Sequence, residues 1–359
     1  MKRVDVVTHD GFPQLAHVVL HRADGPSGIG ESHGHATATA ELLLELAQQF
    51  VGAPLSPARA ATLGQTGPYG TRRADAVVSV ESRAASALEM AAWDLLGNAL
   101  EVPLAFALGG ARAERVPVYA TAVGADHVAA LQDPRRVASA LAGHGFSLVK
   151  LAPFTRDGAF SAELARVEEA VSTGVRIAVD LVGQFDRATA ARRCARLDAV
   201  GLAWIEDPVA DSLLGPLPSF LRRLDTPVCV GERCAGIHAY DRLIRDEAVG
   251  LVHLDVAWCG GLSVARTVGE VAAAHAVPVA LHNDMGPVAW ATSLHLAQHL
   301  GRSTLVECPS AGILETYPSI VASLPAIADG RSTPAGPGHG CTLSPSYLAR
   351  ARVRSVGAR

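Results

Sequence analysis

The sequence has no surplus of basic residues and no long apolar segment. Its 31 Lys and Arg residues against 35 Asp and Glu residues give a formal net charge of −4, which provides no positive field for nucleic acid or an anionic lipid surface. Gly, Pro or charged residues interrupt every apolar stretch well before the length of a membrane span, and the first residues contain no apolar signal-peptide core. We therefore expect neither a nucleic-acid nor a membrane partner.

The cysteines also form no recognisable pattern. None of the six belongs to a C-x-x-C pair or to a zinc-like spacing, so a reduced, cytoplasmic protein is the expectation. Hydrophobic residues make up 49% of the 359 positions, which is enough apolar material for one large core or two smaller ones.

The chain changes its rhythm near Gly110. Before it, a few strands are followed by helices. After it, short apolar runs recur at roughly 25–30 residues, the length of one βα unit, with Ala-rich helical segments between them. This pattern favours a parallel barrel. A doubly wound sheet would need a G-x-G-x-x-G loop after its first strand, and residues 119–127 do not match it. The eight runs lie at 116–120, 147–152, 176–180, 202–206, 227–232, 251–255, 278–282 and 304–307.

Carboxylates end three consecutive runs. Asp180, Glu206 and Glu232 are spaced by 26 residues each, and barrel enzymes keep their active sites at the carboxyl ends of the strands. A single acid there is ordinary, but three acids converging on one mouth repel one another unless a cation neutralises them. All-oxygen ligands favour Mg²⁺, so we expect these residues to bind Mg²⁺.

The following strand ends carry Asp255 and His282. A carboxylate beside an imidazole fixes its tautomer and raises its basicity, which makes a general base, although either residue alone could be structural. Lys150 shares a strand face with Ala152. Inside a barrel mouth this lysine could pair with a substrate carboxylate, and the alternative is a surface lysine.

Several segments resemble the enolase superfamily, most closely its mandelate racemase-like branch. The match runs from about residue 28 to residue 310, in the family's order. The segments are GIGES (28–32), EMAAWDLLGNALEVPLAFALGG (89–110), GFSLVKLA (145–152), AVD (178–180), WIEDP (204–208), VGE (230–232), LDVAWCGGL (254–262) and HNDMGPVA (282–289).

The resemblance implies a modified (β/α)7β TIM-type barrel under an N-terminal α+β capping domain. We expect the cap at residues 1–112, with a C-terminal return at about 318–359, and the barrel at 113–317. It also implies Mg²⁺ on the three acids, a base dyad of Asp255 and His282, and a substrate-carboxylate partner at Glu307. The family reaction begins with abstraction of the proton α to a carboxylate, which gives a metal-stabilised enediolate. Such a proton is too weak an acid for imidazole without a divalent cation and hydrogen-bond donors.

Two departures from the family pattern narrow the reaction. The family's second lysine, the acid/base of the opposite face, is replaced by Ala152, and the Asn or His often found two residues after the first metal ligand is replaced by Val182. Two-base racemisation is therefore disfavoured. Elimination remains possible with one group, because the imidazolium of His282 can protonate a departing β-hydroxyl in a syn geometry.

We therefore predict a Mg²⁺-dependent hydro-lyase acting on a polyhydroxy acid or a related small carboxylate. His282 would be the base, Asp255 would orient it, and Lys150 and Glu307 would hold the substrate carboxylate. His33 is a candidate substrate-binding residue from the cap, with a surface loop position as the alternative. A one-base racemase, epimerase or cycloisomerase, and a carboxylate-binding protein without turnover, are the competing functions. The resemblance also favours a homo-oligomer.

Overall fold

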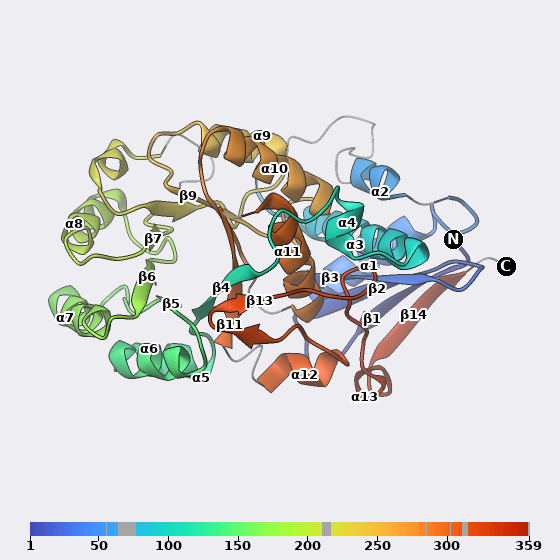
Figure 1. Ribbon diagram of the computed structural model, residues 1–359, viewed down its shortest axis with the longest axis horizontal. Helices are drawn as coiled ribbons and strands as arrows, with labels where there is room; N and C mark the ends of the chain where they lie inside the picture. Colours follow the sequence, from blue (N-terminus) through green and yellow to red (C-terminus); the bar gives the residue numbers. More distant parts are fainter. Residues whose placement is uncertain are drawn as a thin grey trace.

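The structure, a computed structural model, describes residues 1–54, 56–63, 77–209, 217–283, 286–301, 303–310 and 315–357. Figure 1 shows two parts, an antiparallel sheet with helices on the right and a barrel on the left. This arrangement confirms the predicted barrel with an N-terminal cap. None of the described helices is long and apolar enough to cross a membrane.

The cap is built on a four-stranded sheet in the order β14-β1-β2-β3, with every neighbouring pair antiparallel. Its last strand comes from the far end of the chain, and Arg3 of β1 lies opposite Gly357 of β14. We propose the division given by the sequence, a cap of 1–112 with 318–359 around a barrel of 113–317. The elements of these chain segments are β1 (Arg3–Thr8), β2 (Leu15–His21), β3 (Ser27–His33), α1 (Ala36–Ala47), α2 (Pro57–Leu63), α3 (Val80–Leu100), α4 (Leu104–Ala107), α12 (Tyr317–Ile320), β12 (Ile327–Ala328), β13 (Arg331–Ser332), α13 (Pro345–Leu348) and β14 (Arg352–Gly357). Of these, β12 and β13 belong to the sheet of the barrel.

Eight parallel strands, β4 to β11, form the barrel, and pairing of β11 with β4 closes it. They coincide with the eight predicted apolar runs. β13 adds to the start of β4 in antiparallel register. The barrel elements are β4 (Val116–Thr121), α5 (Ala125–Ala130), α6 (Pro134–Gly143), β5 (Leu148–Leu151), α7 (Phe160–Val171), β6 (Arg176–Asp180), α8 (Arg187–Leu197), β7 (Ile205–Glu206), η2 (Ser219–Arg223), β8 (Val228–Val230), α9 (Ile237–Ile244), β9 (Leu251–Leu254), α10 (Leu262–Ala274), β10 (Val279–Leu281), α11 (Pro287–Leu300) and β11 (Thr304–Pro309).

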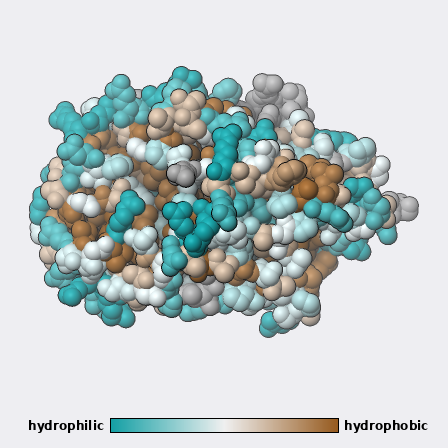
Figure 2. Space-filling model, viewed as in Figure 1, coloured by the Kyte–Doolittle hydropathy of each residue, from teal (hydrophilic) through white to brown (hydrophobic). Residues whose placement is uncertain are grey.

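Side chains, not a channel, fill the barrel below the strand ends. Tyr119, Trp204 and Cys229 belong to a buried cluster of inward-pointing residues, and the rings of Tyr119 and Trp204 meet edge to face at 5.1 Å. A larger cluster lies between the strands and the surrounding helices, and a separate one fills the cap. Figure 2 shows apolar residues within the barrel half and hydrophilic residues along its outline. The packed floor leaves the carboxyl ends of the strands as the place for chemistry.

Helix α3 packs unusually close to strand β3. Ser79 caps the helix in a reciprocal pair of hydrogen bonds with Ser82, which satisfies two of the free amides of the first turn. The glycines of the GIGES segment permit the contact, because a Cβ at Gly28 would lie 2.2 Å from the carbonyl oxygen of Ala91. These glycines are therefore required by helix–sheet packing.

Glu31 of the same segment joins the cap to the barrel. Its carboxylate is buried and accepts hydrogen bonds from the amides of Val288 and Ala289 at the N-terminus of α11, at 3.3 and 2.9 Å, and contacts His17 Nε2 at 3.0 Å. Gly286 leaves the space that this carboxylate occupies. Negative charge at a helix N-terminus is favourable, so this contact fixes the start of α11 against the cap.

Candidate active site

The seven predicted barrel residues lie near the carboxyl ends of seven consecutive strands. A cavity of about 530 Å³ opens there, and Lys150, Asp180, Glu232, His282 and Glu307 contribute to its lining. Glu206 and Asp255 are buried outside the lining. In order around the barrel, Lys150 lies in β5, Asp180 ends β6, Glu206 ends β7, Glu232 follows β8, Asp255 follows β9, His282 follows β10 and Glu307 lies in β11.

The three predicted metal ligands form a buried group of like charges. Burial raises the pKa of Asp180, and the neighbouring Glu232 raises it further. Burial likewise raises the pKa of Glu206 well above its usual range. At Glu232, the nearby His282, His253 and Lys150 outweigh burial and lower the pKa. A group of acids arranged in this way is stabilised by added positive charge.

Asp207 is a fourth acid of this group, which sequence reasoning missed. It is buried, and its backbone has a φ of 39°, a conformation that non-glycine residues rarely adopt. Burial and the carboxylates of Glu232, Asp180 and Glu206 raise the pKa of Asp207 well above its usual range. A rule of one acid for each strand end does not include the residue directly after Glu206.

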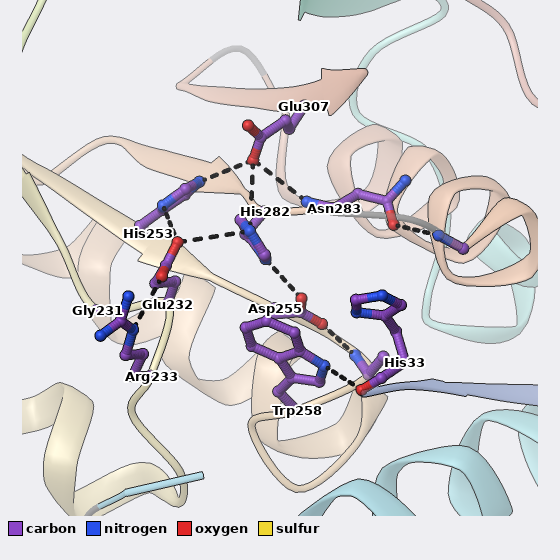
Figure 3. A network of polar contacts seen from close by, with 12 residues as sticks. His33, Gly231, Glu232, Arg233, His253, Asp255, Trp258, His282, Asn283 and Glu307 are labelled. Carbon is purple, nitrogen blue, oxygen red and sulfur yellow. Dashed lines mark hydrogen bonds and ion pairs between the residues drawn. The ribbon is translucent and has the colours of Figure 1, made fainter. Parts of the chain in front are cut away.

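Asp255 and His282 form a short hydrogen bond between Oδ2 and Nδ1, at 2.6 Å (Figure 3). The other carboxylate oxygen of Asp255 accepts from the amide of Ala257 at 2.7 Å, which fixes its orientation. His282 Nε2 faces the cavity side, 3.4 Å from Glu232 Oε2 and 3.9 Å from Glu307 Oε2. Burial opposes a charge on the ring, but these three carboxylates outweigh it and raise the pKa of His282 to about 10.

Lys150 and Glu307 form a buried ion pair. Lys150 Nζ lies 2.5 Å from Glu206 Oε1 and 2.8 Å from Glu307 Oε1. These acids outweigh burial and raise the pKa of Lys150 well above its usual range, so the ammonium is charged. Burial opposes ionisation of Glu307, but Lys150 and His253 outweigh it and lower the pKa of Glu307 well below its usual range. Thr121 donates to the same carboxylate.

His253 lies beneath the site and was also missed. Its ring is fully buried and lies 3.8 Å from Glu232 Oε2 and 3.3 Å from Glu307 Oε2 (Figure 3). Glu206 Oε1 lies 3.5 Å away and the hydroxyl of Tyr119 lies 3.2 Å away. One imidazole therefore touches acids from three strands. Alternation along β9 puts residue 253 on the same face as residue 255, and this signal could have revealed it.

A second possible ligand group contains Glu206, Cys229 and His253, whose ligand atoms lie within 4.8 Å of one another. Burial raises the pKa of the Cys229 thiol well above its usual range. A protonated thiol is a poor metal ligand, so the oxygen set of Asp180, Glu206 and Glu232 is the better cation site.

The Trp258 ring contacts the rings of both His33 and His282. The His33 ring stacks on Trp258 with 6.1 Å between centroids, and the Trp258 ring lies 5.0 Å from that of His282. The His33 carbonyl accepts from Trp258 Nε1 at 3.1 Å and from Arg83. Among the described residues that line the cavity, Arg83 and Trp258 are present and His33 is not.

The two positions that depart from the family pattern differ in location. Ala152 lines the cavity, so the small side chain leaves open space beside Lys150. Val182 is 43% exposed with a φ of 54°, and its amide donates to Asp180 Oδ1 at 2.7 Å. Its side chain therefore supplies no acid to the cavity, whereas its backbone orients a predicted metal ligand.

Comparison with known families agrees with this geometry. The model of the mandelate racemase/muconate lactonizing enzyme N-terminal domain matches residues 7–109, and the model of the enolase C-terminal domain-like family matches residues 132–347. The chain belongs to the mandelate racemase/muconate lactonizing enzyme family of the enolase superfamily. The family resemblance predicted from the sequence motifs is thereby confirmed.

Individual proteins resemble the chain over most of its length. A D-galactonate dehydratase from Verminephrobacter eiseniae is 28% identical over 86% of this chain and 81% of its own length. An enolase protein from Sargasso Sea environmental sequencing is 30% identical, with a TM-score of 0.85 over 100% of this chain and 99% of that one. An enolase of the mandelate racemase subgroup from Agrobacterium tumefaciens is 26% identical, with a TM-score of 0.84 over 99% and 98% of the two chains.

Proposed function

We propose that this member of the mandelate racemase/muconate lactonizing enzyme family is a Mg²⁺-dependent acid-sugar dehydratase, a hydro-lyase that removes water from a hydroxy acid. The observation that carries the proposal is the position of His282. Its Nδ1 is fixed by Asp255, and its Nε2 faces the acids Glu232 and Glu307 in the cavity that Lys150 also lines. The likeness to D-galactonate dehydratases supports the acid-sugar class.

The residues present fit a magnesium ion. Asp180, Glu206 and Glu232 supply only oxygen donors from three adjacent strands, and burial together with mutual repulsion makes the group favour a cation. Mg²⁺ held by these three residues would offset the carboxylates around His282 and polarise the carboxylate of the substrate. Asp207 lies outside the proposed ligand set, and burial together with its acidic neighbours raises its pKa and so favours its neutral form.

Lys150 of β5 and Glu307 of β11 would hold the substrate carboxylate. These two strands lie on either side of β4. Lys150 is positively charged and is fixed by Glu206 and Glu307, so it can attract an incoming carboxylate without reorganisation. Glu307 can hydrogen-bond that carboxylate only in its protonated form. A second carboxylate close to Glu307 favours this form because like charges raise a pKa.

His282 would then remove the α-proton. Asp255 holds Nδ1 as the protonated nitrogen, so Nε2 is the atom that accepts the proton from the substrate. The same Nε2–H can return its proton to a β-hydroxyl that leaves from the same face, and water departs. Ala152 and Val182 supply no second acid, which makes syn elimination by one histidine the most economical chemistry.

The test is a screen of hexonic and hexaric acids with the Mg²⁺-loaded protein in D₂O. Keto-acid product is read by semicarbazide absorbance, and deuterium at the α-carbon is read by mass spectrometry. A keto acid that disappears in His282→Asn but persists when the exposed Asp157 is changed to Asn is the expected result. Deuterium uptake without keto acid would instead indicate isomerisation. Binding of acids without either signal would indicate a carboxylate-binding protein.

A further inference from the structure

Arg83 of the cap forms part of the wall of the cavity that contains His282. It lies near the start of α3, four residues after Ser79, the N-cap residue of that helix. The proposed dehydration assigns no role to this guanidinium.

Two contacts, with Trp258 and with His33, orient the Arg83 side chain. Its guanidinium carbon lies 4.2 Å from the centroid of the Trp258 ring, and Nη1 donates to the carbonyl of His33. Gly34 makes room for it, because a Cβ at that position would lie 2.9 Å from Nη1. Stacking on an aromatic face and a fixed fork of donors are the conditions under which arginine recognises carboxylates well.

Arg83 lies on the Trp258 side of His282 in the cavity lining. In Figure 3, Glu307 and Trp258 lie on opposite sides of His282. Lys150 pairs with Glu307 on one side, and Trp258, with Arg83 stacked over it, lies 5.0 Å from the His282 ring on the other. A substrate whose first carboxylate is held near Lys150, with its α-carbon at His282, therefore extends its far end toward Arg83.

We propose that Arg83 binds a second carboxylate at the far end of the substrate, so that the preferred substrates are sugar diacids. This inference rests on the proposed function for the orientation of the substrate. It adds a prediction about the chemical group at the far end of the substrate, which the proposed function leaves open. A hexaric acid carries a carboxylate where the hexonic acid of the same configuration carries a hydroxymethyl group, and only the former can form a charge-assisted pair with arginine.

The test compares such matched pairs of acids by titration calorimetry in the presence of Mg²⁺. His282→Asn serves as the background, so that no acid is consumed during the titration. We expect each diacid that binds to do so about tenfold more tightly than its monoacid. Arg83→Gln should weaken diacid binding about tenfold and change monoacid binding less than twofold. Arg83→Lys should restore part of the difference, because it keeps the charge and loses the planar fork.

Arg59 provides a matched control outside the cavity. Its guanidinium also stacks on an aromatic ring, 5.4 Å from the centroid of Phe50, and donates to the carbonyl of Pro54 at 2.8 Å. Arg59→Gln should leave both affinities unchanged. Equal affinities within pairs, an equal loss of both acids in Arg83→Gln, or no diacid binding at all would each overturn the inference. Arg83-dependent diacid binding without dehydration by the unaltered protein would overturn the proposed reaction and leave the inference standing.

Discussion

Glu31 Oε1 of the cap lies 2.9 Å from the amide of Ala289, in the first turn of the helix that follows the proposed base. The carboxylate is fully buried, and its other oxygen contacts His17 at 3.0 Å. The His17 ring in turn contacts the hydroxyl of Tyr347 at 3.2 Å. A polar chain therefore runs from the C-terminal segment through the cap to the rim of the barrel, with no water required between its members.

Changing Glu31 to Gln should destabilise the protein. The amide nitrogen of Gln cannot accept a hydrogen bond. Because each carboxylate oxygen of Glu31 accepts from an amide of α11, either Val288 or Ala289 loses its partner inside the protein. Leaving such a buried group unsatisfied costs about 3 kcal/mol. Chemical denaturation of the two proteins measures the difference. Glu41→Gln, which removes an exposed partner of Arg354, should change stability little, and equal effects at the two positions would contradict this account of Glu31.

Asp255→Asn should slow catalysis and leave substrate binding nearly intact. The amide group can donate to His282 Nδ1, which stabilises the tautomer with its proton on Nε2 and so removes the base. A positioned general base contributes about 100-fold or more to the rate, and we expect kcat to fall by this factor while KM changes by less than threefold. Steady-state kinetics on an accepted acid measures both. A loss that appears only in KM would argue against an orienting role for Asp255.

Magnesium should raise the melting temperature of the unaltered protein, because a ligand that binds only the folded state stabilises it. Asp180→Asn should abolish this rise. Without the metal the same variant should melt at a higher temperature than the unaltered protein, because it removes one charge from a repelling group. Thermal scans with and without MgCl₂ provide the test. Asp241→Asn, on the exposed face of α9, should respond to magnesium as the unaltered protein does.

His295 should make stability depend on pH outside the active site. Burial, aided by the charge of His339, lowers the pKa of His295 to about 3, while an unfolded histidine titrates near 6.5. Below about pH 6.5, the unfolded state therefore binds a proton at His295 while the folded state does not. The free energy of unfolding falls as the pH drops below this value. Between pH 7 and pH 5 this amounts to about 2 kcal/mol.

The measurement is urea denaturation at both pH values. His295→Asn keeps an acceptor for the amide of Ala105, which lies 3.4 Å from His295 Nδ1, and removes the titration. On acidification from pH 7 to pH 5, the free energy of unfolding of this variant should fall by about 2 kcal/mol less than that of the unaltered protein. His144→Asn, at an exposed position, should behave like the unaltered protein, and an identical pH response in all three would disprove the role of His295.

The candidate site could be predicted best where acidic residues recur at the spacing of a βα unit. Asp180, Glu206 and Glu232 could be placed together because parallel strands bring their carboxyl ends to one rim, and the closed barrel of the structure has that rim. Asp207 could not be found by this rule, since its position depends on a left-handed backbone turn directly after β7. Periodicity does not predict such a turn.

Side chains from the cap were harder to anticipate. Arg83 and Trp258 are separated by the first six strands of the barrel, β4 to β9, and only the packing of α3 against the barrel brings them together. Their contact depends on small structural requirements, such as the space left by Gly34, that have no sequence period. His33 illustrates the same limit, because its ring stacks on Trp258 while its backbone carbonyl makes the polar contacts.

The pairing of β14 with β1 has a consequence for biosynthesis. Arg3 leaves the ribosome early, but its partner Gly357 is synthesised only after the whole barrel. During that interval the nascent cap presents β1 as an open strand edge, which is prone to pairing with other chains. In the sequence, the barrel is inserted between the first three strands of the cap sheet and its fourth strand, β14. A nascent chain that stalls before Arg352 would leave the β1 edge without its partner.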